Sequence, residues 1–176
     1  MRNRDVIKKL AQSYDSFYLY DEDVIKEKMC HLKENFPGVK FLYSMKCNPQ
    51  NNVLQTIFDN GFGADAASLG EVLKANELGL AKNEIYYSAP GKMKKDIEIA
   101  LDKSVIIVDS IDEIYRIEEI AAELDKVVSI GVRINPNFTL LGDICQFNKF
   151  GIDEEQIDTY LNGMQCPHIK VTGIHV

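Results

Sequence analysis

The chain has 176 residues, enough for one domain with a substantial core, and its 27% charged and 45% hydrophobic residues are typical of a soluble globular protein. A net charge of −7 without a basic stripe argues against nucleic acid as a partner. No apolar run approaches the roughly 20 residues that cross a bilayer, and residues 1–9 lack the apolar segment of a secretion signal, so no membrane contact is expected.

The cysteines fit a reducing compartment better than a disulfide framework. They lie at positions 30, 47, 145 and 166, with no Cys-x-x-Cys pair. Together with three scattered histidines they form no zinc pattern. We therefore expect a cytoplasmic protein with reduced thiols and no metal site.

The first elements are predicted to lead into a larger unit. In order, they are a short polar helix over residues 1–12, a strand over Ser16–Tyr20, a helix capped by Asp21 that runs to about Asn35, and a turn at Pro37-Gly38. The expected division is a strand and a helix within residues 1–36, followed by the main unit over 37–176.

A regular alternation of strands and helices follows. Apolar strands are predicted to begin near Phe41, Gly63, Ile85, Val105, Val128 and Lys170. Helical stretches between them cover Asn51–Asn60, Leu69–Leu78, Lys94–Asp102, Ile111–Leu124 and Glu154–Leu161. The alternation predicts an α/β fold in which helices cover a parallel sheet.

Two architectures fit this alternation, an open doubly wound sheet and a β/α barrel. An open sheet usually binds a nucleotide through a Gly-rich first turn, but the first turn here, Lys46-Cys-Asn-Pro-Gln50, has no glycine. The barrel is therefore favoured. A closed barrel needs eight strands, and the predicted strands number about six, so we expect a TIM-like (β/α)8 barrel that is truncated.

The run Phe41-Leu-Tyr-Ser-Met-Lys-Cys-Asn-Pro49 singles out one lysine. Phe41, Leu42, Tyr43 and Met45 favour a strand, and Pro49 cannot continue the ladder. Lys46 is therefore expected at the carboxyl end of a buried strand, where burial favours a neutral amine that attacks carbonyl groups. The alternative is a strand-end lysine whose amine reaches solvent.

Four further polar residues are predicted at the same end of the sheet, where β/α barrels carry their chemistry: Asp65, Glu71, Arg133 and His175. Each has an ordinary alternative. Asp65 and Glu71 could be acids at a helix start, Arg133 a structural ion-pair partner, and His175 a hydrogen-bonded core histidine. Their convergence with Lys46 indicates one pocket lined by an amine, two carboxylates, a guanidinium and an imidazole.

Two neighbouring features are predicted to have no part in this pocket. The Cys47 side chain should point away from it, because side chains alternate along a strand, and is interpreted as a packing residue. The lysine cluster within Lys92–Lys95 is interpreted as the solvated start of a helix.

Five ordered motifs resemble those of the fold-type III pyridoxal-phosphate decarboxylases, which include diaminopimelate, ornithine, lysine and arginine decarboxylases. They are Tyr43-Ser-Met-Lys-Cys-Asn-Pro49, Gly61-Phe-Gly-Ala-Asp-Ala-Ala-Ser-Leu-Gly-Glu71, Arg133-Ile-Asn-Pro136, Lys149-Phe-Gly-Ile152 and Gly173-Ile-His-Val176. The likeness covers Phe17 to Val176. The similar alanine racemases share the barrel type but carry a different run after their lysine, so they fit less well.

The resemblance implies a pyridoxal 5'-phosphate cofactor and a role for each pocket residue. Lys46 would form the internal aldimine, and His175 would stack on the ring face. Asp65 and Glu71 would form an acidic network beside Lys46, and Arg133 would neighbour the ring oxygen or that network. The implied reaction is decarboxylation of a basic or diamino L-amino acid, with the pyridine ring as the electron sink.

The resemblance also indicates parts that lie outside this chain. The family has a Gly-rich phosphate site, an acid for the pyridine nitrogen and a C-terminal β-domain, which are expected beyond residue 176. We therefore expect a homodimer for the full-length protein and no activity for residues 1–176 alone. The alternative of another class is a non-catalytic pyridoxal-phosphate-binding or regulatory relative, although such a protein has no need of Lys46.

Residues 137–148 bear on the substrate. Many diaminopimelate decarboxylases are longer here and carry a histidine and a tyrosine, whereas this chain has neither in that segment. An ornithine-, lysine- or arginine-like substrate, as in polyamine biosynthesis, is therefore expected. Diaminopimelate, the substrate in lysine biosynthesis, is the alternative.

Overall fold

The computed structural model describes residues 4–136, 149–161, 163 and 165–176. Its strands form one sheet in which every pair is parallel, in the order β1-β2-β3-β4-β5-β6, with β7 also paired to β5. The strands are β1 (Leu42–Ser44), β2 (Gly63–Ala66), β3 (Ile85–Tyr87), β4 (Val105–Val108), β5 (Val128–Asn135), β6 (Ile152–Asp153) and β7 (Ile169–His175). The predicted α/β fold with a parallel sheet is confirmed.

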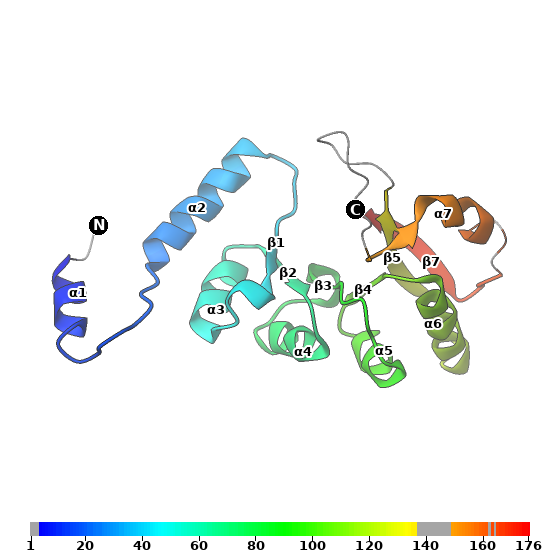
Figure 1. Ribbon diagram of the computed structural model, residues 1–176, viewed down its shortest axis with the longest axis horizontal. Coiled ribbons are helices and arrows are strands. Elements are labelled where there is room, and N and C mark those ends of the chain that lie inside the picture. Colours follow the sequence, from blue (N-terminus) through cyan, green and yellow to red (C-terminus); the bar gives the residue numbers. More distant parts are fainter. Residues whose placement is uncertain (1–3, 137–148, 162, 164) are drawn as a thin grey trace.

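Helices α1 and α2 precede the first strand, and the helices that follow connect the strands. They are α1 (Arg4–Leu10), α2 (Glu22–Asn35), α3 (Asn51–Asp59), α4 (Leu69–Glu77), α5 (Lys94–Ala100), α6 (Ile111–Glu123) and α7 (Glu154–Leu161), with single 3-10 turns η1 (Met45–Cys47) and η2 (Lys82–Glu84). Helices α3 to α6 follow one another along the same side of the sheet (Figure 1). None of the helices in the described ranges is both long and apolar enough to cross a bilayer.

The core lies between the sheet and these helices. In α6, Ile114, Ile117 and Ile120 recur at helical spacing, and each is at most 1% exposed. They belong to one buried cluster with Ile106 and Val108 of β4. Because side chains alternate along a strand, the remaining residues of β4 face the other side of the sheet.

A glycine allows the segment after residue 148 to pack on β5. Gly151 has a φ of +89°, and a Cβ atom there would lie 2.9 Å from the backbone nitrogen of Asn135. Any side chain would therefore be strained and would collide with the strand. The close approach lets β6 pair with the carboxyl end of β5, through Ile134 and Ile152.

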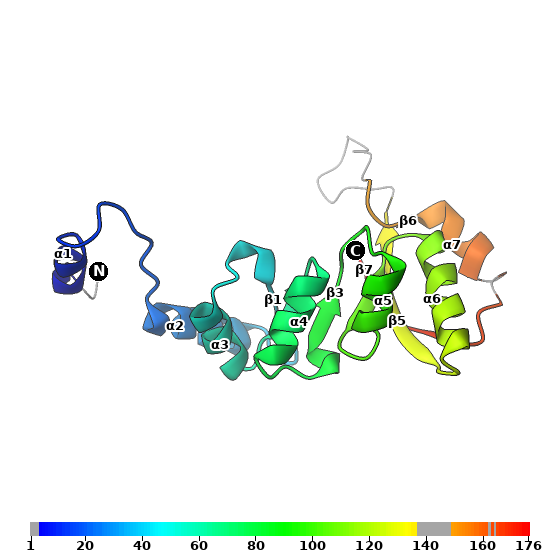
Figure 2. The ribbon, with the colours of Figure 1, turned by 90° about the horizontal axis from the view of Figure 1, so that it is seen from below.

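The secondary structure differs from the prediction at two places. Ser16–Tyr20 forms no strand, since no other strand in the described part of the chain lies beside it, and Tyr18 is 91% exposed. The short strand β6 was not predicted, because two residues carry no periodic signal. Helix α1 buries no residue and lies far from the sheet (Figure 2).

Candidate active site

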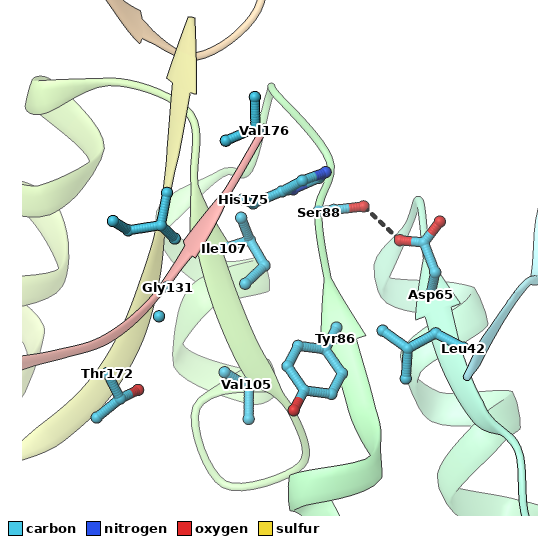
Figure 3. A pocket seen from close by; sticks show the side chains of 12 residues that line it. Leu42, Asp65, Tyr86, Ser88, Val105, Ile107, Gly131, Thr172, His175 and Val176 are labelled. Atoms are coloured by element: carbon cyan, nitrogen blue, oxygen red, sulfur yellow. Dashed lines mark hydrogen bonds between the residues drawn. The ribbon is translucent and has the colours of Figure 1, made fainter. Parts of the chain in front are cut away.

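A cavity of about 580 Å³ lies on the face of the sheet opposite the helices (Figure 3). Its size falls in the range of small-molecule sites. It is lined by Leu42, Asp65, Tyr86, Ser88, Val105, Ile107, Gly131, Thr172, Gly173, Ile174, His175 and Val176. Most of these residues alternate with the core residues of the same strands, so the strand pattern that builds the core also builds the cavity.

Asp65 and His175 both line this cavity, as predicted for a shared pocket. Asp65 lies on β2, and its Oδ1 accepts a hydrogen bond of 2.6 Å from the Ser88 hydroxyl, just after β3 (Figure 3). His175 ends β7. Ser88 was not predicted, although its position directly after a strand was the available signal.

The surroundings of His175 favour the neutral imidazole. Burial lowers its pKa from the ordinary 6.5, and the nearby Arg133 charge lowers the pKa further. Asp65 and Asp109 oppose this shift without cancelling it. At neutral pH the ring is therefore an uncharged flat surface at the cavity wall.

Arg133 is beside His175, because the two are register partners on β5 and β7. Its Nη1 atom lies 3.1 Å from Oδ1 of Asp109, and its guanidinium lies 4.8 Å from the ring centre of Phe150. Arg133 is thus a structural ion-pair partner and also a neighbour of the cavity. The sequence left these two roles, ion-pair partner and pocket residue, as alternatives, and each describes part of its surroundings.

Glu71 caps the start of α4 and does not line the cavity. Its backbone N–H donates to the Ser68 hydroxyl at 3.2 Å, and its Oε2 accepts from the Ala67 N–H at 2.7 Å. This is the helix-start alternative considered for the acid. Within the described ranges the Glu71 carboxylate forms no ion pair.

The expected burial of Lys46 was wrong. Strand β1 ends at Ser44, and the chain turns into η1, which leaves the Lys46 side chain exposed. Ser44 pairs in register with Asp65, so Lys46 follows β1 just beyond the level of that acid. The Lys46 amine has no hydrogen bond or ion pair with the residues that the structure describes, and it is therefore free to bind a ligand.

Cys47 does not line the cavity, as predicted, but it is exposed rather than packed. It borders a separate groove beside Tyr43 and Asn48.

Lys92 is the largest departure from the predicted site. It was interpreted as part of a solvated cluster, yet its side chain is 0% exposed and its amine lies 2.8 Å from Oε1 of Glu113. The same amine donates to the carbonyls of Ala89 and Ile107, each at 2.7 Å. Burial lowers the Lys92 pKa from 10.5, although Glu113 acts in the opposite direction. No signal in the sequence distinguishes Lys92 from the exposed Lys94 and Lys95 of the same cluster.

The donor set suits a ligand with an aldehyde and a flat aromatic ring. A free amine attacks an aldehyde carbonyl, and a neutral imidazole offers a face on which a ring can stack. The Asp65 carboxylate and the Arg133 guanidinium supply opposite charges near that face. Asp65 of β2 and His175 of β7 line the cavity, whereas Arg133 of β5 and Lys46, in the turn after β1, lie beside lining residues without lining it themselves.

Comparisons with known proteins agree with this chemistry. The family model described as the pyridoxal-binding domain of pyridoxal-dependent decarboxylases matches residues 22–176. A diaminopimelate decarboxylase of Helicobacter pylori strain J99 is 34% identical over 177 residues, which cover 94% of this chain and 44% of that protein. An L-glutamyl-[BtrI acyl-carrier protein] decarboxylase of Niallia circulans is 31% identical. The match covers 91% of this chain and 39% of that protein.

A solved structure has the same fold. Diaminopimelate decarboxylase from Helicobacter pylori, crystallised in complex with L-lysine, superposes with a TM-score of 0.83 at 32% identity. The match covers 96% of this chain and 46% of that one. The chain therefore spans less than half the length of the relatives that it matches.

Proposed function

We propose a decarboxylase function from the premise that this chain belongs to the pyridoxal-dependent decarboxylase family, whose pyridoxal-binding domain it matches over residues 22–176. The full-length protein removes the carboxyl group of a basic or diamino L-amino acid. One observation carries the proposal: the free Lys46 amine follows β1 beside the strand that brings Asp65 into the cavity, and His175 shares that cavity.

Lys46 is the residue that would hold the aldehyde of pyridoxal phosphate. Within the described ranges the Lys46 amine has no ion pair or hydrogen bond, so none has to break before the amine binds the cofactor. When bound, pyridoxal phosphate supplies an electron sink for the electron pair left when carbon dioxide departs.

His175 and Asp65 would orient the ring. His175 offers its imidazole face at the cavity wall, and its lowered pKa keeps the ring uncharged at neutral pH. The Asp65 carboxylate is fixed by the Ser88 hydroxyl at 2.6 Å, which holds a negative charge at the cavity edge nearest to Lys46. Arg133, beside His175, pairs with Asp109, while Glu71 holds the turn between β2 and α4.

The substrate class is supported by the relatives. The Helicobacter pylori enzyme is named a diaminopimelate decarboxylase and was crystallised with L-lysine, the compound that decarboxylation of diaminopimelate yields. Diaminopimelate is accordingly the second candidate substrate. Against it stands the short segment 137–148, which lacks the histidine and tyrosine of many diaminopimelate decarboxylases and lies outside the described residues.

Borohydride reduction tests the cofactor assignment. The full-length protein, saturated with pyridoxal phosphate, is reduced and digested, and the pyridoxyl mass is mapped. We expect the label on Lys46. A label on Lys92, Lys149 or another lysine contradicts the assignment, and the absence of any label favours a non-catalytic relative.

Carbon dioxide release identifies the substrate. Ornithine, lysine, arginine and diaminopimelate are assayed in parallel with the full-length protein. We expect turnover of one of the first three, and a strong preference for diaminopimelate selects the second candidate. No release from any of the four contradicts the proposed substrate class.

Assembly and location belong to the same proposal. By resemblance to the family, the full-length protein is a homodimer that acts in the cytoplasm. Light scattering of the full-length protein in solution should give twice the mass of one chain, and a monomer that turns over substrate contradicts it.

A further inference from the structure

Lys92 is bonded in a way that excludes it from carbonyl chemistry. An ammonium has three donors, and three oxygens lie within 2.8 Å of the Lys92 Nζ atom, those of Ala89, Ile107 and Glu113. The charged head also lies 5.2 Å from the ring centre of Tyr87, which favours a cation. The Lys92 amine is thus held by two hydrogen bonds and one buried ion pair within the protein.

These bonds join two loops at the carboxyl end of the sheet. Lys92 and Ala89 belong to the loop after β3, Ile107 lies on β4, and Glu113 lies in the first turn of α6. Glu113 continues the connection, because its Oε2 accepts the backbone N–H of Asp109 at 2.9 Å. Arg116 adds a further link by donating from Nη1 to the Lys92 carbonyl at 3.0 Å.

The connection ends at the candidate active site. The Asp109 backbone is held by Glu113, and its carboxylate pairs with Arg133 at 3.1 Å. Arg133 is the register partner of His175, which lines the cavity. Asp109 is 8% exposed and Glu113 is 3% exposed, so solvent screens these charges weakly.

We infer that the buried Lys92–Glu113 pair is a positioning device for the cofactor site: it fixes Asp109, so that Asp109 holds the Arg133 guanidinium beside His175. The inference rests on the proposed function, since it assigns the pair to the pyridoxal-phosphate site. Neither Lys92 nor Glu113 lines the cavity, so both act through Asp109 and Arg133.

Stability alone does not account for such a pair. Replacing a buried ion pair with apolar residues of similar size is often neutral or stabilising, whereas removing one partner is costly. A variant that loses both charges can therefore remain folded and still lose the connection to Asp109. This separates a positioning role from a merely structural one.

The decisive variant is Lys92→Met combined with Glu113→Leu in the full-length protein. Its matched control is Lys94→Gln combined with Glu123→Gln, which removes an exposed pair at 3.3 Å between α5 and α6. Both variants leave the net charge unchanged. The first readout is the titration of His175 in the protein without cofactor, followed by NMR and assigned by the loss of its signal in His175→Gln.

The charged groups that act on His175 are Arg133, Asp65 and Asp109. Once Asp109 is released, the Arg133 charge is less compensated, and we expect the His175 pKa to fall by about one unit in the decisive variant. The second readout is the dissociation constant of pyridoxal phosphate, which should rise about tenfold. The control should change neither.

A decisive variant that matches the control in both readouts overturns the inference, whatever its melting temperature. If it does not fold, Glu113→Gln is compared with Asp112→Asn, which removes a neighbouring exposed charge from the same helix turn. A fall in the His175 pKa in Glu113→Gln alone supports positioning, and equal titrations overturn it. If the parent protein does not bind pyridoxal phosphate, the proposed function fails, while the titration without cofactor still decides the positioning role.

Discussion

Two lysines follow strands of the same sheet, and their surroundings differ sharply. Lys46 follows β1, is exposed and has no partner among the described residues, whereas Lys92 follows β3, is buried and has three. The acids around them are arranged alike. Asp65 and Asp109 lie on or just after the next strand, and each next helix begins with a serine cap and a glutamate that accepts a backbone N–H.

Under the proposed function, the number of protein partners of the amine, rather than its burial, separates the lysine that binds the cofactor from the structural one. Burial lowers the Lys92 pKa, a feature often associated with nucleophilic lysines. Its amine nevertheless donates two hydrogen bonds, to the Ala89 and Ile107 carbonyls, and forms an ion pair with Glu113. Lys46 lacks such acceptors within the described ranges and keeps its amine for a ligand.

The largest effect should come from Lys46→Ala. We expect decarboxylation to fall by several orders of magnitude, as when a covalent nucleophile is removed, and the visible absorption of the bound cofactor to disappear. Because the side chain is exposed, the free energy of unfolding should change by less than about 0.5 kcal/mol. Lys95→Ala, at another exposed lysine, is the control for both measurements. Retained activity in Lys46→Ala would contradict the assignment of Lys46 as the lysine that binds the cofactor.

Lys92→Ala should instead lower the free energy of unfolding and leave the labelling of Lys46 unchanged. It leaves Glu113 as an uncompensated buried charge, so we expect a loss of about 3–5 kcal/mol in the free energy of unfolding, measured with urea. At roughly 2–4 °C per kcal/mol, the melting temperature falls clearly. Borohydride labelling of the fraction that remains folded should still find Lys46. A loss below about 1 kcal/mol would mean that the pair is not fully desolvated.

Substitutions at His175 test whether its side chain holds the cofactor ring by stacking. His175→Phe keeps an aromatic face and His175→Ala does not. We therefore expect the Phe variant to bind pyridoxal phosphate more tightly than the Ala variant by about 1 kcal/mol, or roughly fivefold. Fluorescence titration measures both dissociation constants. Equal losses in the two variants would indicate a polar role for the imidazole instead of stacking.

The smallest expected effect is a pH dependence of stability. The pKa of His175 is lower in the folded protein than the ordinary 6.5, so the unfolded chain binds more protons between the two values. Stability should therefore fall as pH decreases from 6.5 to the folded pKa and then level off. His175→Gln should lose this part of the dependence in urea unfolding at a series of pH values. An unchanged pH profile would show that another group is responsible.

Most of the sheet and its helices could be predicted from the sequence, because apolar periodicity determines which residues face the core. Helix α7 lies over the predicted residues, and α3 to α6 begin where predicted and end one or two residues earlier. The strand expected at Ser16–Tyr20 failed for a physical reason. Strand propensity describes a fit to a neighbouring strand, and the described part of the chain supplies none at that place.

The candidate site was predictable in its residue types but not in their contacts. Asp65 and His175 share the cavity, as expected from their places at strand ends. The burial of Lys92 was not predictable, because nothing in the cluster Lys92–Lys95 distinguishes the one lysine that the loop directs inward. The exposure of Lys46 was missed because β1 ends at Ser44, two residues earlier than its apolar pattern suggests.

The strand order has a consequence for synthesis on the ribosome. From β1 to β5, each strand pairs with the one made just before it, so each addition closes only a short loop at a small entropic cost. The sheet can thus grow in the direction of translation. Strand β7 departs from this rule, because it returns to β5 after β6 and α7 have been made. The strand that carries His175 is consequently made after the residues of the Lys92–Glu113 and Arg133–Asp109 ion pairs, so these pairs can form before His175 reaches the cavity.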